Sequence, residues 1–146
     1  MSKVLVANQT RIVEAVCDPD GSWLPGVPVI AVYPRGVHWD DVERIEQPAA
    51  AAEAWQIAAV LTSGFASAWL WRRSAGTGLS TASVRVSPVV LAGLPWPAGD
   101  VGAATVALRA GDVRACARHV DLAYGAPELT TWWEESLERI EARRVR

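Results

Sequence analysis

Residues 48–73 read PAAAAEAWQIAAVLTSGFASAWLWRR and predict two consecutive helices. Alanine has the highest helix propensity, and Pro48 is tolerated in a first helical turn because its missing amide would have no partner there. The apolar face of the first helix consists of Trp55, Ala58, Ala59 and Leu61. We expect Gly64 to break this pattern, so that a second helix, FASAWLWRR, follows and ends at two arginines.

The segment before these helices, residues 3–34, has the features of β-structure. Apolar residues alternate in KVLVA and in RIVEAVC (residues 11–17), and the DPDG of Asp18–Gly21 is typical of a hairpin turn. Pro28 and Pro34 flank the next strand, PVIAVYP, and indicate a short or edge strand because proline cannot donate a ladder hydrogen bond. The first third of the chain therefore predicts a small antiparallel sheet.

A short strand and a short helix are expected after the second long helix. ASVRVS (residues 82–87) alternates between polar and apolar residues, as a strand does. In SPVVLAGL we expect Ser87 as the N-cap and Pro88 as the first helical residue, and LPWP ends this helix. Residues 1–97 are thus expected to form an α+β unit, a small antiparallel sheet packed with helices.

Residues 98–146 predict a helical C-terminal extension. AGDV occurs twice, each time before an alanine-rich stretch, so Asp100 and Asp112 are the expected N-caps of two helices. Pro127 precedes ELTTWWEESLERIEARR, in which apolar residues recur at helical spacing. We expect this extension to pack on residues 1–97, so that the chain is one compact domain.

The composition indicates a soluble globular protein, with 51% hydrophobic and 21% charged residues. No apolar run approaches the ~18 residues of a membrane span, and the N-terminus has no signal-peptide core, so we expect a cytoplasmic protein. Cys17 and Cys116 are expected to be buried, reduced thiols. His38 and His119 do not have metal-ligand spacing, and we expect neither a metal nor another cofactor.

The charges are unevenly distributed. The net charge of −2 excludes a chain that is basic as a whole, which is the usual signature of nucleic-acid binders. Between Glu53 and Asp100, however, there is no acid, and the charged residues are Arg72, Arg73 and Arg85. The arginines at the chain end are interpreted as a solvated helix end at the negative pole of the helix dipole, not as DNA contacts. They are Arg143, Arg144 and Arg146.

No catalytic motif is evident, and we expect no enzyme activity on this chain. Gly76–Gly78 (GTG) lacks the lysine of a phosphate-binding P-loop, and no serine has the setting of a nucleophile elbow. The adjacent acids Asp40 and Asp41 are expected to point apart, and so are the next such pair, Glu134 and Glu135. A catalytic pair of a cysteine, Cys17, with a histidine stays open as an alternative.

Most of the eight tryptophans are expected in the core. Those surrounded by aliphatic residues are Trp55, Trp69, Trp96 and Trp133. Trp71 differs because it adjoins two arginines and precedes the glycine loop. It is a candidate for stacking on a base or a sugar, or for a cation–π contact with its own arginines.

The middle of the chain resembles a known family in its order of motifs. AAVLTSGFASAWLW (residues 58–71), followed by GTGLSTASVRVSPVVLAGLPWP (residues 76–97), is similar to the target recognition domains of restriction–modification systems, including the C-terminal specificity regions of adenine-N6 DNA methyltransferases. In that family a helix reading roughly "ALLNS" precedes an aromatic helix, a glycine loop, a strand and a helix ending in "LPIP". Thr62 stands where the family usually has asparagine, and the chain has one lysine where the family has many.

The resemblance implies a DNA-specificity domain that needs a partner. The chain has neither the Asn/Asp-Pro-Pro-Tyr/Phe tetrapeptide that holds a flipped adenine nor a glycine-bearing turn for S-adenosylmethionine. A methyltransferase or restriction–modification partner domain would then carry the catalysis. The helical extension lies outside the family pattern.

Under this hypothesis double-stranded DNA is the ligand. A glycine loop lets backbone amides approach phosphates, arginines neutralise phosphate charge, and a bidentate guanidinium on the following strand reads a base edge. The predicted DNA-binding residues are Trp71, Arg72, Arg73, Gly76, Thr77, Gly78 and Arg85.

Two other interpretations stay open. The arginines and the glycines can simply end and cap a helix. The whole chain can be a protein–protein interaction domain with a tryptophan-rich docking face and no nucleic-acid ligand.

Overall fold

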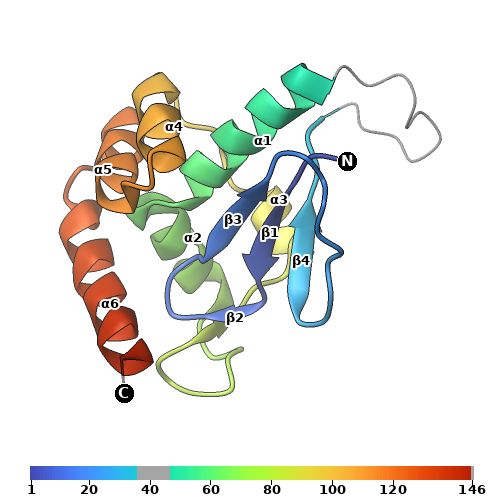
Figure 1. The fold of residues 1–146 in the computed structure, drawn as a ribbon. Coiled ribbons are helices and arrows are strands. Elements are labelled where there is room, and N and C mark those ends of the chain that lie inside the picture. Colours follow the sequence, from blue (N-terminus) through green and yellow to red (C-terminus); the bar gives the residue numbers. More distant parts are fainter. Residues whose placement is uncertain (36–46, 146) are drawn as a thin grey trace.

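The computed structural model describes residues 1–35 and 47–145 and has the expected α+β fold (Figure 1). A small antiparallel sheet packs against α1 and α2, and the C-terminal helices lie on the far side of these two helices from the sheet. The elements are β1 (Lys3–Ala7), β2 (Gln9–Thr10), β3 (Ala15–Asp18), β4 (Val29–Val32), α1 (Gln47–Leu61), α2 (Gly64–Ser74), β5 (Val84–Arg85), α3 (Pro88–Ala92), α4 (Gly102–Arg109), α5 (Val113–Ala123) and α6 (Leu129–Arg144).

The sheet has the strand order β3-β1-β4, and β2 pairs separately with β5. The predicted strand at residues 11–17 is therefore wrong in its first half. The Val13 amide donates to Ser67 Oγ of α2 at 3.0 Å instead of to a neighbouring strand, so tertiary packing overrides the alternating pattern. Strand pairing resumes at β3, with Val4 of β1 opposite Cys17.

The DPDG turn forms, but it does not connect paired strands. The Gly21 amide donates to the Asp18 carbonyl at 3.3 Å, and Gly21 has a φ of +67°. The strands on either side of it, β3 and β4, flank β1 on opposite edges, so the turn starts a longer connection and not a hairpin. The expectation that β4 is a short edge strand is confirmed.

The main core lies between the sheet and the helices α1 and α2. Its buried side chains include Val4, Val6, Ala54, Ala58, Leu61 and Leu70. Two smaller clusters connect the C-terminal helices to this unit, one around Cys116 and Val120, and one formed by Ile12, Ala117 and Trp133. The alanines of α1 let neighbouring backbones approach closely, and their burial is what holds α4 against α1.

Helix α2 is fixed at its N-terminus by two side chains from different parts of the chain. Ser63 caps it by accepting from the Ala66 amide at 3.1 Å. Asp121 of α5 is fully buried and accepts from the Gly64 amide at 3.2 Å and the Phe65 amide at 2.8 Å. Burial raises the pKa of this carboxyl above its ordinary value, although its hydrogen bonds act in the opposite direction.

The break at Gly64 has a steric reason. A Cβ at this position would lie 2.5 Å from the Leu129 carbonyl oxygen of α6, so a side chain cannot fit. Thr130 of α6 donates to Asp121 at 2.7 Å, and α5 and α6 are thereby joined to the start of α2. Only a glycine allows this three-helix junction.

The capping predictions have a mixed outcome. Asp112 caps α5 by accepting from the Ala115 amide at 2.9 Å, as expected. Asp100 is not a cap, because α4 begins one residue later, after Val101. The short helix α3 begins at Pro88 as predicted. In the described part of the chain, no helix has the length and apolarity that crossing a membrane requires.

Candidate nucleic-acid interface

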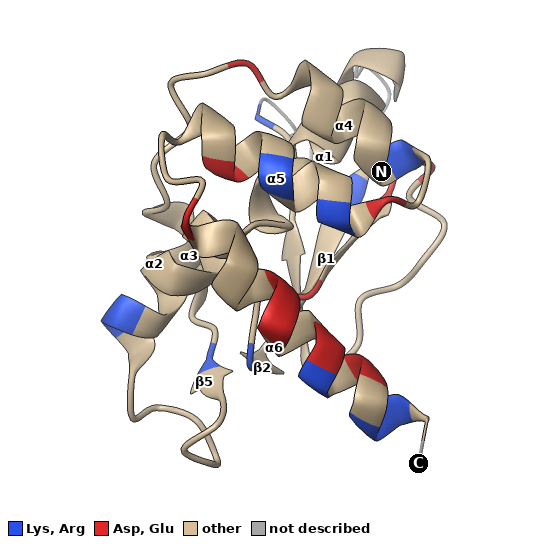
Figure 2. Cartoon of the chain, turned by 90° about the vertical axis from the view of Figure 1, so that its left-hand side faces the viewer, with Lys and Arg blue, Asp and Glu red and all other residues tan. Residues whose placement is uncertain are grey.

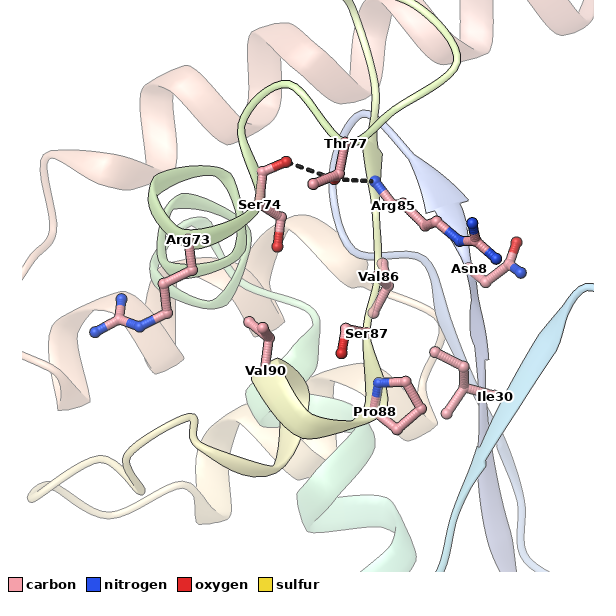
Figure 3. Close-up of a pocket in the computed structure, with 10 residues that line it drawn as sticks. All are labelled: Asn8, Ile30, Arg73, Ser74, Thr77, Arg85, Val86, Ser87, Pro88 and Val90. Atoms are coloured by element: carbon pink, nitrogen blue, oxygen red, sulfur yellow. Dashed lines mark hydrogen bonds between the residues drawn. The ribbon is translucent and has the colours of Figure 1, made fainter.

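The end of α2, the loop that follows it and β5 enclose an open pocket of about 490 Å³ (Figure 3). Its polar lining consists of Asn8, Arg73, Ser74, Thr77, Arg85 and Ser87. Apolar side chains complete it, including Ile30, Val86 and Val90. Three of the predicted DNA-binding residues, Arg73, Thr77 and Arg85, thus line one concavity.

Thr77 holds the two walls of this pocket together. Its backbone amide donates to the Ser74 carbonyl at 3.1 Å and its hydroxyl donates to the same carbonyl at 2.6 Å. The Arg85 amide in turn donates to the Thr77 hydroxyl oxygen at 3.1 Å (Figure 3). The end of α2 and the strand β5 are therefore tied at a fixed separation.

The glycines of the loop meet structural requirements. Gly76 has a φ of +82°, which a residue with a side chain adopts only under strain. A Cβ on Gly78 would lie 2.0 Å from the Ser83 carbonyl oxygen, so the two arms of the loop touch there. The helix-capping interpretation is thus correct for the conformation of Gly76, and it leaves the exposed backbone of the loop accessible.

The arginines of α2 differ in their settings. The Arg73 guanidinium lies 3.0 Å from the centre of the Trp69 ring, one helical turn earlier, and this stacking holds it at the pocket rim. Arg72 is exposed, and as the next residue on the helix it points in another direction. Neither of them nor Arg85 takes part in an ion pair within residues 1–35 and 47–145.

The pocket is lined by two guanidinium groups and by no carboxylate. Arg73 and Arg85 lie on opposite walls, with the hydroxyl groups of Ser74, Thr77 and Ser87 between them (Figure 3). Hydroxyl, amide and guanidinium donors together suit an anion, above all a phosphate group. The pocket is chemically an anion site with an apolar floor.

Asn8 is a pocket residue that the sequence analysis missed. Its backbone connects β1 to β2, accepting from the Val86 amide at 2.8 Å and donating to Pro28 at 3.2 Å. Its side chain lies beside the Arg85 side chain (Figure 3), and its Oδ1 is buried without a hydrogen-bond partner among the described residues. No local pattern marks this asparagine, since its position depends on the pairing of β2 with β5.

Trp71 has a structural role instead of a place in the pocket. Its indole Nε1 donates to the Arg11 carbonyl, and its ring is half-buried. The cation–π contact expected for Trp71 forms at Trp69, because residues four apart on a helix face each other and adjacent ones do not. The core prediction is correct for Trp133 and wrong for Trp96, which is 53% exposed.

The two cysteines are buried free thiols, as predicted. Burial raises the pKa of Cys17 to about 11 and that of Cys116 to about 12, with nearby carboxylates adding to the shift. Both thiols are therefore protonated at neutral pH, which argues against a cysteine nucleophile. No group of three His, Cys, Asp or Glu side chains within the described ranges could hold a metal ion.

Relatives of known function would be an independent source for the role of this pocket. Comparison of the chain with protein-family models, with curated protein sequences and with solved structures gives no match in any of the three. The pocket between α2 and β5 and the motif order of residues 58–97 are therefore the basis on which its function is inferred.

Proposed function

We propose that this chain is a non-catalytic target-recognition domain that binds double-stranded DNA. The observation that carries the proposal is the convergence of Arg73 and Arg85 on one carboxylate-free pocket, with Thr77 fixing the distance between its walls. Phosphate contacts by arginine provide most of the affinity of such proteins and set their register on the duplex.

Base reading is assigned to β5 and the residue beside it. Arg85 lies on the strand that follows the loop, and arginine commonly donates two hydrogen bonds to guanine in the major groove. The partnerless Oδ1 of Asn8 is an acceptor that can orient this guanidinium or receive a base amino group. Both side chains carry donors or acceptors that can discriminate base pairs.

The proposal includes a catalytic partner. The motif order of residues 58–97 is similar to that of specificity domains in restriction–modification systems, and such domains act with a methyltransferase or nuclease domain. An apolar surface on the β3–β4 connection, where Trp23 is 51%, Leu24 95% and Val27 99% exposed, is suited to such a partner. The same surface favours the second candidate function, a protein–protein interaction domain without a nucleic-acid ligand.

Duplex binding distinguishes the two functions. We expect a labelled random-sequence duplex to bind at low salt, with an affinity that falls linearly in log–log plots against salt concentration. Arg73→Ala combined with Arg85→Ala should lower the slope of that plot by about 1.8, since each lost phosphate contact removes about 0.9. The matched control is Arg109→Ala with Arg118→Ala, which removes the same charge from α4 and α5, away from the loop (Figure 1).

An equal loss of affinity in the two double variants would reduce the effect to net charge and refute the pocket as the binding site. Absence of any duplex binding, together with capture of a partner through the exposed apolar connection, would establish the second function instead.

A further inference from the structure

A second arginine pocket lies on the other side of the loop that follows α2. It has a volume of about 330 Å³ and is lined by loop residues Ser80, Ala82 and Ser83. The charged side chains that line it are Arg11, Glu14, Arg143 and Arg144. Residues from the start, the middle and the end of the chain thus meet there, a combination that the sequence does not suggest.

The loop between the two pockets, residues 75–83, carries no charge and projects from the molecule (Figure 2). Its Leu79 side chain is 91% exposed, although leucine is usually buried. The loop is nonetheless ordered by contacts at both arms, with the Leu79 amide donating to Gln9 Oε1 at 3.4 Å and the Ser83 amide to the Ser80 carbonyl at 3.3 Å. An exposed apolar residue on a braced, uncharged loop is a wedge in search of an apolar environment.

Arginines flank this wedge on both sides. Helix α2 and β5 supply Arg73 and Arg85 on one side, and the end of α6 with Arg11 supplies the other (Figure 2). A DNA groove has the complementary arrangement, with stacked bases at its floor and a row of phosphates along each edge. Apolar wedges between base steps are an established means of bending a duplex from the minor groove.

We propose that residues 75–83 enter a groove of the duplex with Leu79 leading, while the two arginine pockets hold phosphates of the two opposite strands. This inference rests on the proposed function and adds its geometry. Helix α6, which the sequence indicated as a solvated end, becomes part of the interface.

One ion pair limits the second pocket. Glu14 pairs with Arg144 at 2.6 Å, and both side chains are partly exposed at the rim. The carboxylate cancels one positive charge, so Arg11 and Arg143 are the cations left for a phosphate there. A phosphate must therefore bind beside Glu14, at a cost in repulsion.

The test compares a duplex with one of its strands alone. For a random-sequence duplex we expect Arg11→Ala with Arg143→Ala to lower the salt slope by about 1.8, because two phosphate contacts are lost. For the single strand we expect no change, because one strand runs along one side of the loop only. The control is again Arg109→Ala with Arg118→Ala, which should leave the difference between duplex and single strand intact.

The wedge is tested with a duplex that carries 2-aminopurine, whose fluorescence rises when it is unstacked. We expect the natural chain to increase this fluorescence, and Leu79→Ser to abolish the increase and weaken duplex binding about tenfold. Because Leu79 is almost fully exposed, the variant should melt like the natural chain, so a failure to fold does not confuse the result.

The outcomes separate this inference from the proposed function. Loss of binding in the Arg73/Arg85 variant, with no effect of the Arg11/Arg143 and Leu79 variants, would overturn the groove insertion and leave DNA binding intact. An equal effect of the Arg11/Arg143 substitutions on duplex and single strand would also overturn it. If the natural chain binds no duplex at low salt, both fail.

Discussion

Removal of the Asp121 carboxylate should loosen the junction of three helices and weaken DNA binding from a distance. Asp121→Ala deprives the buried Gly64 and Phe65 amides and the Thr130 hydroxyl of their acceptor. A buried donor left without a partner costs about 1–3 kcal/mol, so the two amides alone should lower the free energy of unfolding by about 4 kcal/mol. The substitution also frees the N-terminus of the helix whose other end carries Arg73.

Urea denaturation followed by tryptophan fluorescence measures this loss, and Thr130→Val is the matched control. That variant removes one hydrogen bond and keeps the two amide contacts, so about 1 kcal/mol is expected. A loss below about 1 kcal/mol for Asp121→Ala would refute the reasoning, since it would mean that water or another group satisfies the two amides.

The pH dependence gives a second check on the same residue. The raised pKa means that the native state holds the Asp121 proton more tightly than the unfolded chain does. This group's contribution to stability is therefore largest below the unfolded pKa, near 3.8, and decreases as the pH rises toward the folded value. Asp121→Asn should remove that decrease from the profile of unfolding free energy against pH.

Three further predictions concern other parts of the chain. Lys3→Met should leave the buried Asp18 carboxylate without its ion-pair partner at 2.6 Å and destabilise the fold by about 3 kcal/mol in urea denaturation. Although burial alone would raise the Asp18 pKa, hydrogen bonds from the lysine and from two backbone amides lower it, so this contribution is present above about pH 3.8 and lost on acidification; an unchanged acid transition in the Lys3 variant would contradict this. Gly78→Ala should force the loop apart, because its Cβ would meet a carbonyl at 2.0 Å, and should reduce duplex affinity in anisotropy titrations with little change in melting temperature. Glu14→Gln should strengthen duplex binding, since it releases Arg144 and removes a negative charge from the second pocket, and weaker binding would count against a phosphate there.

Local signals in the sequence were sufficient for the helices. Alanine-rich stretches, a proline at the first position of α3 and the aspartate before α5 act through neighbouring residues only, and these predictions agree with the structure. The β-region was harder, because pairing joins residues far apart. The alternation at residues 11–14 looks like a strand, but the segment packs on α2 through the bond from Val13 to Ser67.

The candidate pocket was predicted in part for the same reason. Arg73, Thr77 and Arg85 are close in sequence, and the loop between them brings them together. Asn8 comes from the other side of the β2–β5 pair, and no neighbouring residue marks it. The second pocket needs the end of α6 to return to the β1–β3 connection, which follows from the packing of Trp133 on Ile12 and from no periodicity.

The connection at residues 8–14 is a wall that both pockets share, since Asn8 lines one of them and Arg11 and Glu14 line the other. This wall is anchored from inside, with Ile12 in the cluster around Trp133 and Val13 in the main core. The spacing between the two rows of cations is consequently set by how tightly the interior is filled. Exchanging Trp133 for a smaller aromatic residue would retune the span of the clamp without altering a single surface atom that a polyanion meets.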